Sequence, residues 1–244
     1  MMRQPMAANA VFITATGTGV GKTLVSSLLL GFLRKQGVKA GYQKWVSTGG
    51  AMPEDLLYCL RKNDMEFARG QLDRQVVYRF LLPASPHLAA ENEGRQIDPG
   101  RINEAFGQSA KEYDVLVVEG VGGVLVPLRR DLLLADFLTG LQLPSLIVAH
   151  SGLGTINHTL LTIEAMRQRD LPVLGVVFSD EQEGMAVDDP LVADNMRTIA
   201  DMAGVEVFGR LLRLADYTLL EKAFQPVGQA IWQRLPWLAE AQQR

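Results

Sequence analysis

The sequence has a single cysteine, Cys59, among its 244 residues. An intramolecular disulfide is therefore excluded, and so low a cysteine content is typical of proteins from reducing compartments. No apolar run reaches the roughly 18 residues of a membrane-spanning helix. Residues 1–10 are too polar for the apolar part of a signal peptide and lead directly into a strand-like segment. We therefore expect a cytoplasmic protein.

Clusters of basic residues are also missing. The chain carries 24 lysines and arginines against 27 aspartates and glutamates, which gives a net charge of -3. Nucleic acids and anionic membranes are therefore not expected as partners. His150 and His158 have no metal-ligand spacing with a cysteine or another histidine, and no G-x-S-x-G segment offers a serine nucleophile. The sequence thus contains no sign of covalent nucleophilic catalysis.

Apolar residues are plentiful, at 48% of the chain, and their spacing indicates alternating strands and helices. Near-continuous apolar runs are typical of strands that are covered on both faces. The predicted strands are 11–16, 39–46, 114–120, 144–150, 172–179 and 205–212, and the predicted helices are 22–36, 155–169 and 190–203. This alternation predicts an α/β fold with a doubly wound, mostly parallel sheet flanked by helices.

We expect one domain over residues 1–244, with a flexible N-terminus at 1–10. The stretch 47–112 is more polar and less regular than the rest. Because α/β folds place their ligands at the carboxyl ends of the strands, we interpret this stretch as an elaboration on the substrate side of the sheet.

Residues 14–23, TATGTGVGKT, connect a predicted strand to a predicted helix. They resemble a phosphate-binding loop, although the strict pattern G-x-x-x-x-G-K-[ST] requires glycine at the position of Thr16. Alternating glycines let the backbone adopt positive φ values and bring its N–H groups close to an anion. The positive end of the following helix adds to this attraction. The predicted nucleotide-binding residues are Gly17, Thr18, Gly19, Val20, Gly21, Lys22 and Thr23.

In such a loop Lys22 reaches the terminal phosphates, and the Thr23 hydroxyl binds Mg²⁺. Two other interpretations compete with a phosphate site. The loop could be a glycine-rich turn that only caps a helix, or a Rossmann dinucleotide loop, which has no need of a lysine at the helix start. The strand before the loop and the Lys-Thr pair at the helix start favour a P-loop NTPase-like fold.

Three charged residues lie near predicted strand or helix ends. Glu119 ends an apolar strand and is followed by glycines, so it could reach Mg²⁺ or could face water as a strand-end acid. Asp55 begins a helical pattern, where the helix dipole alone favours an acid. Lys44 lies near the end of the second predicted strand and could neutralise phosphate charge or simply be solvated. Residue type and position alone do not decide these alternatives.

Six segments together resemble the dethiobiotin synthetase family, whose members are ATP-dependent carboxylase-cyclases of biotin synthesis. The segments are FITATGTGVGKT, GYQKWVSTG, PASPHLAAENEGRQID, VVEGVGGVLVPL, GLGTINHTLLT and DNMRTIADMAGVEVFGRL. Each is a weak or moderate signal by itself, but their order and spacing along the chain are specific to this family.

The resemblance implies roles for individual residues. Catalytic roles are implied for Lys22, Lys44 and Thr18. Mg²⁺ ligation is implied for Thr23, Asp55 and Glu119. Contact with the nucleotide base is implied for Ser179 and Leu211. Contact with the substrate is implied for Thr48, Leu153, Gly154 and Asn157, the last three acting on the substrate's distal carboxylate across the interface of a homodimer.

The implied reaction is a phosphoryl transfer without an enzyme-bound intermediate. The implied substrates are 7,8-diaminononanoate, CO₂ and ATP. One amine and CO₂ give a carbamate, whose oxygen attacks the γ-phosphate of ATP. The second amine then displaces phosphate and closes the ureido ring. The protein would contribute positioning and charge neutralisation.

Four positions depart from the family's pattern. Ala15 replaces the glycine that opens the loop, and an added methyl group there is expected to be tolerated. Trp45 replaces a proline after the site lysine, which predicts a bulky ring near the substrate. Ser179 replaces an asparagine that reads the base, and GRLLRL (209–214) lacks a nearby proline. Base selectivity between ATP and other nucleoside triphosphates therefore stays open.

Two rival functions share this kind of loop. Partitioning ATPases work as nucleotide-gated dimer switches, but they place a lysine where this chain has Gly17. A related ATP-dependent acid-activating ligase would normally carry an extra glutaminase domain, for which 244 residues leave no room. Both remain alternatives to the carboxylase-cyclase.

Overall fold

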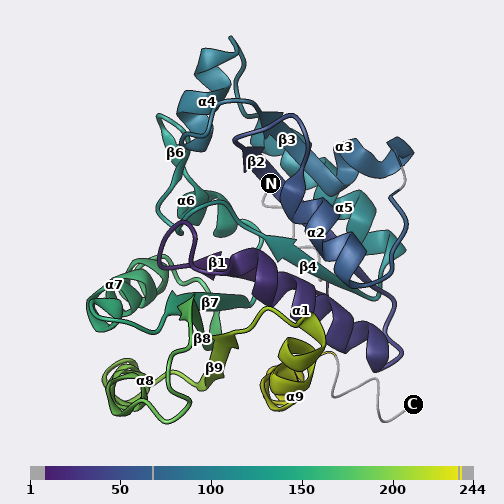
Figure 1. Cartoon of the computed structure of the whole chain (residues 1–244). Coiled ribbons are helices and arrows are strands. Elements are labelled where there is room, and N and C mark those ends of the chain that lie inside the picture. Colours follow the sequence, from purple (N-terminus) through teal and green to yellow (C-terminus); the bar gives the residue numbers. More distant parts are fainter. Residues whose placement is uncertain (1–8, 68, 236, 238–244) are drawn as a thin grey trace.

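The computed structural model describes residues 9–67, 69–235 and 237. Residues 1–8 of the predicted flexible N-terminus lie outside these ranges, whereas Ala10 already begins the first strand. Seven parallel strands form a central sheet in the order β3-β2-β4-β1-β7-β8-β9 (Figure 1). Because β1 lies in the middle and later strands are added on both sides of it, the predicted doubly wound parallel sheet is confirmed.

The elements alternate along most of the chain. The strands of the central sheet are β1 (Ala10–Ala15), β2 (Ala40–Thr48), β3 (Val76–Phe80), β4 (Val115–Glu119), β7 (Ser145–His150), β8 (Val173–Glu183) and β9 (Val207–Arg213). The longer helices are α1 (Lys22–Lys35), α2 (Glu54–Lys62), α5 (Pro99–Glu112), α7 (Thr155–Arg167), α8 (Pro190–Ala203) and α9 (Tyr217–Arg234). The shorter elements are η1 (Arg69–Gln71), α3 (Leu72–Gln75), α4 (Pro86–Asn92), α6 (Leu134–Leu138) and the antiparallel pair β5 (Pro127–Arg129) and β6 (Leu132–Leu133).

Helices cover both faces of the sheet, as Figure 1 shows. One apolar core lies between the sheet and α1, α2 and α9, and it includes Val11 and Ile13 of β1. The other core lies between the sheet and α4 to α8, and it includes Ala10 and Phe12. Neighbouring residues of a strand point to opposite faces. Each central strand must therefore be apolar at nearly every position, as the sequence pattern indicated.

The stretch 47–112 is more regular than expected. It contains α2, η1, α3, α4 and α5, together with the edge strand β3, which the sequence pattern did not predict. The apolar run of β3 is only VVYRF and is interrupted by Arg79. A run so short and mixed does not stand out from a loop by periodicity.

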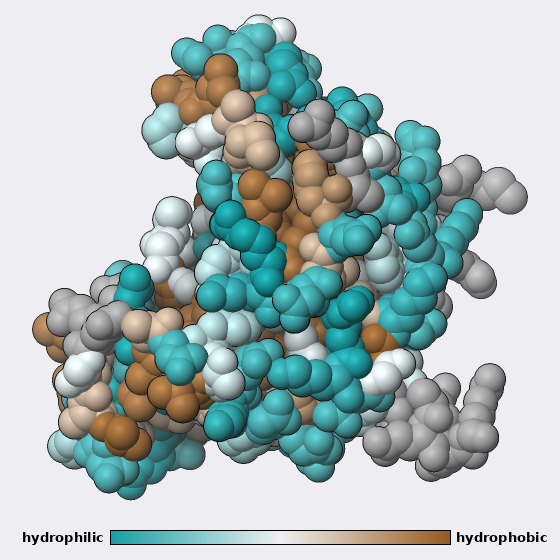
Figure 2. All heavy atoms as spheres, turned by 45° about the vertical axis from the view of Figure 1, so that its right-hand side comes forward, coloured by the Kyte–Doolittle hydropathy of each residue, from teal (hydrophilic) through white to brown (hydrophobic). Residues whose placement is uncertain are grey.

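The last helix, α9, packs against α1. Phe32 of α1 makes edge-to-face contacts with Phe224 and Trp232, with ring centroids 6.4 and 6.3 Å apart. These contacts make α9 part of the apolar core on this face of the sheet. Among the described residues, no helix combines the length and apolarity needed to cross a membrane. Figure 2 shows a face that is mostly hydrophilic, with apolar side chains gathered in a few patches.

Candidate nucleotide and metal site

The glycine-rich loop joins the end of β1 to the start of α1. Gly19 and Gly21 have φ angles of 80° and 103°, which only glycine adopts without strain. Lys22, the first residue of α1, curls back and donates a hydrogen bond from Nζ to the Gly17 carbonyl oxygen at 3.1 Å. Burial lowers the pKa of Lys22 to about 8, and the charge of Lys44 contributes in the same direction. The loop thus holds a partly desolvated cation beside the first turn of a helix.

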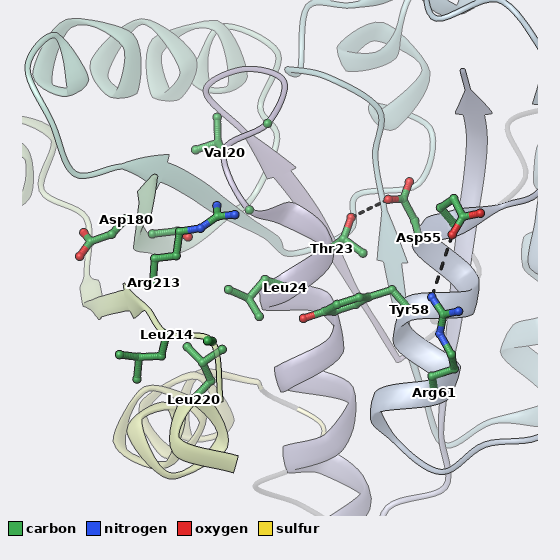
Figure 3. Close-up of a pocket in the computed structure, with 15 residues that line it drawn as sticks. Val20, Thr23, Leu24, Asp55, Tyr58, Arg61, Asp180, Arg213, Leu214 and Leu220 are labelled. Atoms are coloured by element: carbon green, nitrogen blue, oxygen red, sulfur yellow. Dashed lines mark hydrogen bonds and ion pairs between the residues drawn. The ribbon is translucent and has the colours of Figure 1, made fainter. Parts of the chain in front are cut away.

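The residues predicted to bind Mg²⁺ come together at this helix start. Thr23 Oγ1 lies 2.8 Å from Asp55 Oδ1 and 2.9 Å from Glu119 Oε1, both within hydrogen-bond distance (Figure 3 shows the first contact). Asp55 is the second residue of α2, in the first turn after Pro53, and Glu119 is the last residue of β4. The described residues contain no group of three or more histidine, cysteine, aspartate or glutamate side chains that could hold a metal. A cation here would therefore use two carboxylates and one hydroxyl.

Lys44 lies between the two carboxylates. Its Nζ is 2.5 Å from Asp55 Oδ2 and 2.6 Å from Glu119 Oε1. Burial disfavours the charged form of Lys44, but the two acids outweigh burial and raise its pKa. Burial likewise opposes ionisation of Asp55, and the Lys44 charge outweighs it, so the pKa of Asp55 is lowered. Lys44 and Asp55 therefore stabilise each other's charged forms inside the protein.

Glu119 is fully buried and its second oxygen is also satisfied. Tyr42 donates its hydroxyl to Glu119 Oε2 at 2.9 Å. A buried carboxylate is tolerated only when hydrogen bonds and a cation compensate the lost hydration. The alternative that Glu119 is a solvated strand-end acid is therefore wrong, and so is the alternative that Lys44 is a solvated lysine.

Two cavities meet at the loop. The larger, of about 500 Å³, is bounded by the loop, by α2 and by the ends of β8 and β9 (Figure 3). Its lining includes Leu24, Tyr58, Arg61, Ser179, Asp180, Arg213, Leu214 and Ala215. The smaller, of about 330 Å³, is lined by Thr18, Lys22, Lys44, Val46, Thr48 and Val121 among others. Gly19, Gly21, Thr23 and Asp55 border both cavities.

The larger cavity contains one predicted base contact but not the other. Ser179 of β8 lines the cavity beside Gly21 of the loop, whereas Leu211, its partner in β9, is fully buried in the core. The chain reaches the cavity two residues later, at Arg213. Arg213 and Leu214 belong to the segment 209–214 that the resemblance placed near the base, whereas sequence reasoning missed Ala215 and Tyr58. The carboxyl end of β9 would have pointed to Ala215, since ligands of α/β sheets bind at such ends.

A buried ion pair lies next to this base end. Arg210 donates from Nε and Nη2 to the two carboxylate oxygens of Asp180, each at 2.9 Å, and Ser151 also donates to Asp180. Arg210 Nη1 donates further to the carbonyl oxygens of Ala186 and Val187, at 2.8 and 3.0 Å. The network thereby fixes the ends of β7, β8 and β9 relative to the loop that follows β8.

The residues predicted at the substrate's distal carboxylate lie elsewhere. Gly154, with φ at 88°, precedes the first turn of α7, Leu153 is 89% exposed and Asn157 is exposed. Neither cavity at the loop includes them in its lining. Their role across a dimer interface stays a prediction.

The expectation that the Trp45 ring lies near the substrate is wrong. Trp45 is fully buried and packs against Phe12, Phe106 and Phe137, with ring centroids 5.1, 6.3 and 5.3 Å away. Side chains of a strand alternate between its faces. Because Lys44 points to the site, Trp45 points to the core on the opposite face of the sheet.

Known proteins are similar to this chain over most of its length. An AAA domain family model matches residues 9–218. The ATP-dependent dethiobiotin synthetase BioD of Brachyspira hyodysenteriae is 38% identical over 83% of this chain and 91% of its own length. The protein of the same name from Methanococcus vannielii is 36% identical over 82% of this chain and 91% of its own.

Solved structures show the same fold at lower identity. The MinC:MinD cell division complex of Aquifex aeolicus matches with a TM-score of 0.56 and 15% identity, over 96% of both chains. A ParA family ATPase from Chlorobium tepidum matches with a TM-score of 0.52 and 14% identity, over 95% of this chain and 99% of that one. At this identity the likeness concerns the fold alone. The relatives found by sequence are similar enough to establish the family: this chain belongs to the ATP-dependent dethiobiotin synthetases.

Proposed function

We propose that the protein is an ATP-dependent dethiobiotin synthetase, a ligase that forms C–N bonds. It converts 7,8-diaminononanoate, CO₂ and ATP into dethiobiotin, ADP and phosphate in the cytoplasm. The observation that carries the proposal is the meeting of Lys22, Thr23, Lys44, Asp55 and Glu119 at one helix start. The names of the relatives supply the reaction, and this cluster supplies the charges that a phosphoryl transfer requires.

The loop and the start of α1 would bind the triphosphate. Backbone N–H groups of residues 17–21 and the positive end of the helix attract phosphate oxygens. Lys22 would leave the Gly17 carbonyl and reach the terminal phosphates, since its present contact is a single hydrogen bond. The larger cavity adjoins the loop and would hold the ribose and base.

The oxygen set at Thr23, Asp55 and Glu119 fits Mg²⁺. Mg²⁺ prefers oxygen ligands and is usually held by one or two carboxylates together with substrate phosphates. Two carboxylates that each lie within 2.9 Å of one hydroxyl match this requirement. The bound ion would neutralise charge on the phosphates of ATP.

The smaller cavity would hold the reacting end of the diamine. One amine captures CO₂ as a carbamate, and the carbamate oxygen attacks the γ-phosphate, so that the bond to ADP breaks and a mixed anhydride forms. The second amine attacks the anhydride carbon, phosphate leaves and the ring closes. Lys44 faces this cavity and would neutralise the transferred group, while Thr18 and Thr48 would hold its oxygens.

The other end of the substrate would be bound by a second subunit. We propose a homodimer in which Leu153, Gly154 and Asn157 of the partner's α7 start bind the distal carboxylate. Backbone N–H groups at a helix start suit a carboxylate. Their exposure in the single chain leaves them free for this role.

A product assay tests the proposal against its rivals. Purified protein receives diaminononanoate, bicarbonate, Mg²⁺ and ATP, and both phosphate and dethiobiotin are quantified. We expect one phosphate per dethiobiotin, and no phosphate release without the diamine. Phosphate release that ignores the diamine but rises with a macromolecular partner would favour the partitioning ATPase instead. Parallel assays with CTP and GTP measure the base selectivity that Ser179 leaves open.

A further inference from the structure

Lys44 uses the same oxygens that would hold the metal. Its ammonium contacts Asp55 Oδ2 at 2.5 Å and Glu119 Oε1 at 2.6 Å, and this Glu119 oxygen also accepts from Thr23. An ammonium and a divalent cation at contact distance from the same carboxylate oxygen repel each other, most strongly where water is excluded. Each cation therefore weakens the binding of the other at this position.

The cluster is electrically balanced as it stands. Lys22 and Lys44 carry two positive charges, and Asp55 and Glu119 carry two negative charges. Glu119 is fully buried and the side chain of Lys44 is only 7% exposed, so water screens these charges poorly. A divalent cation added alone would leave two uncompensated charges here, whereas a cation that arrives with a polyphosphate brings its own compensation.

The smaller cavity provides space into which the Lys44 side chain can move. It lies beside the Lys44 side chain and is bordered by Thr18 and Thr48, so an anion bound there could draw the ammonium away from the carboxylates. A flexible lysine stem allows this movement without a change in the backbone.

We propose that Lys44 is an internal counter-ion that excludes the divalent cation until nucleotide is bound. Without nucleotide, Lys44 neutralises Asp55 and Glu119. When nucleotide and cation enter together, Lys44 moves from the carboxylates to the terminal phosphate, and the cation takes its place. Metal binding and nucleotide binding are thereby coupled through one side chain. This inference rests on the proposed function only in that the site takes a metal–nucleotide complex.

The test is metal binding without nucleotide. Mn²⁺, as a spectroscopic substitute for Mg²⁺, is titrated into the wild type, Lys44→Met and the control Lys39→Met, with free Mn²⁺ followed by electron paramagnetic resonance. Lys39 is exposed and directly precedes β2. We expect Lys44→Met to bind Mn²⁺ at least about 10-fold more tightly than the wild type and the control, within the range usual for coupled sites. Mg²⁺ should also raise the Tm of Lys44→Met alone.

Equal Mn²⁺ affinity in the wild type and Lys44→Met would overturn the proposal, as would tighter binding that survives the added substitution Glu119→Gln. If Lys44→Met folds only when Mg²⁺ is present, that result supports the proposal. If Lys44→Met does not fold at all, the proposal is tested on the wild type alone. The wild type must then bind Mn²⁺ in the presence of a non-hydrolysable ATP analogue and must not bind it in its absence. Because the titration contains no diamine and no CO₂, its result does not depend on whether the protein makes dethiobiotin.

Discussion

Ser179 Oγ lies 2.6 Å from the position that a Cβ atom on Gly21 would occupy. Gly19 has a similar positive φ, but nothing lies within 4 Å of its missing Cβ. Gly19→Ala should therefore cost only the left-handed strain of about 1–2 kcal/mol in the free energy of unfolding. Gly21→Ala should cost about 1–3 kcal/mol more, because the Ser179 side chain must shift. Urea denaturation of the two variants measures the difference.

A second substitution isolates the contact. Ser179→Gly removes the clashing hydroxyl, so the double variant Gly21→Ala/Ser179→Gly should recover most of the extra loss. The same substitution should do nothing for Gly19→Ala. Purely additive effects in the Gly21 pair would mean that the end of β8 does not constrain the loop.

The low pKa of Lys22 predicts a pH dependence of ATP binding. Burial lowers this pKa to about 8 in the free protein, and bound phosphate would raise it again because it favours the charged form. ATP affinity should therefore be constant more than about one unit below pH 8, where Lys22 is almost fully charged. It should fall above this pH by up to about tenfold per pH unit, as binding must take up a proton.

Calorimetry in two buffers of different ionisation enthalpy measures that proton uptake directly. We expect uptake to approach one proton per ATP as the pH rises above the Lys22 pKa. An affinity that stays flat across this range, with no uptake, would show that Lys22 remains charged in the free protein.

The buried position of Trp45 predicts a stability effect without a substrate effect. Trp45→Ala should lower the free energy of unfolding by about 3–5 kcal/mol, since it leaves a large cavity between three aromatic rings. The KM for the diamine should stay near the wild-type value. The neighbouring Val46 lines the smaller cavity, so Val46→Ala is the matched variant that should raise this KM. The reverse pattern would place Trp45 at the substrate after all.

The Arg210–Asp180 ion pair predicts a selective loss of nucleotide binding. Arg210→Met leaves a buried carboxylate unpaired, which should cost about 3–5 kcal/mol of stability. Because the ion pair fixes the strand ends that line the larger cavity, the KM for ATP should rise more than kcat falls. Steady-state kinetics below the unfolding temperature measures both.

An exposed pair and a double variant serve as controls. Arg129→Met breaks a pair whose acid, Asp131, is 73% exposed, and should cost at most about 1 kcal/mol. Adding Asp180→Asn to Arg210→Met removes the orphaned charge and should restore part of the stability. An unchanged KM for ATP in Arg210→Met would limit the pair to a structural role.

The strands and the loop could be predicted from the sequence because their signals are local. A strand buried on both faces is apolar throughout, and a phosphate-binding loop is defined by neighbouring residues. Asp55 was different, since an acid at a helix start is favoured whether or not it binds anything. Only the family resemblance indicated its role, and only the fold brings it within 2.8 Å of Thr23.

The base end could be predicted only in part, through the resemblance that indicated Ser179 and the segment 209–214. Its lining combines α2, the end of β8 and residues beyond β9, which no sequence spacing connects. For Trp45 the prediction was wrong. The resemblance suggested a position near the substrate because Trp45 follows Lys44, but adjacent residues of a strand face opposite sides of the sheet.

Cys59 gives this protein a built-in reporter of local opening. Its thiol lies on α2, 3.8 Å from the Thr23 carbonyl oxygen on α1, and burial raises the pKa of the thiol. A thiol that is both buried and protonated reacts only when the two helices separate. Since the sequence has no other cysteine, alkylation of the whole protein reports the separation of α1 and α2, and its rate equals their opening rate when the reagent reacts faster than the helices close. A nucleotide that bridges the loop and Asp55 would slow that reaction without touching the sulfur.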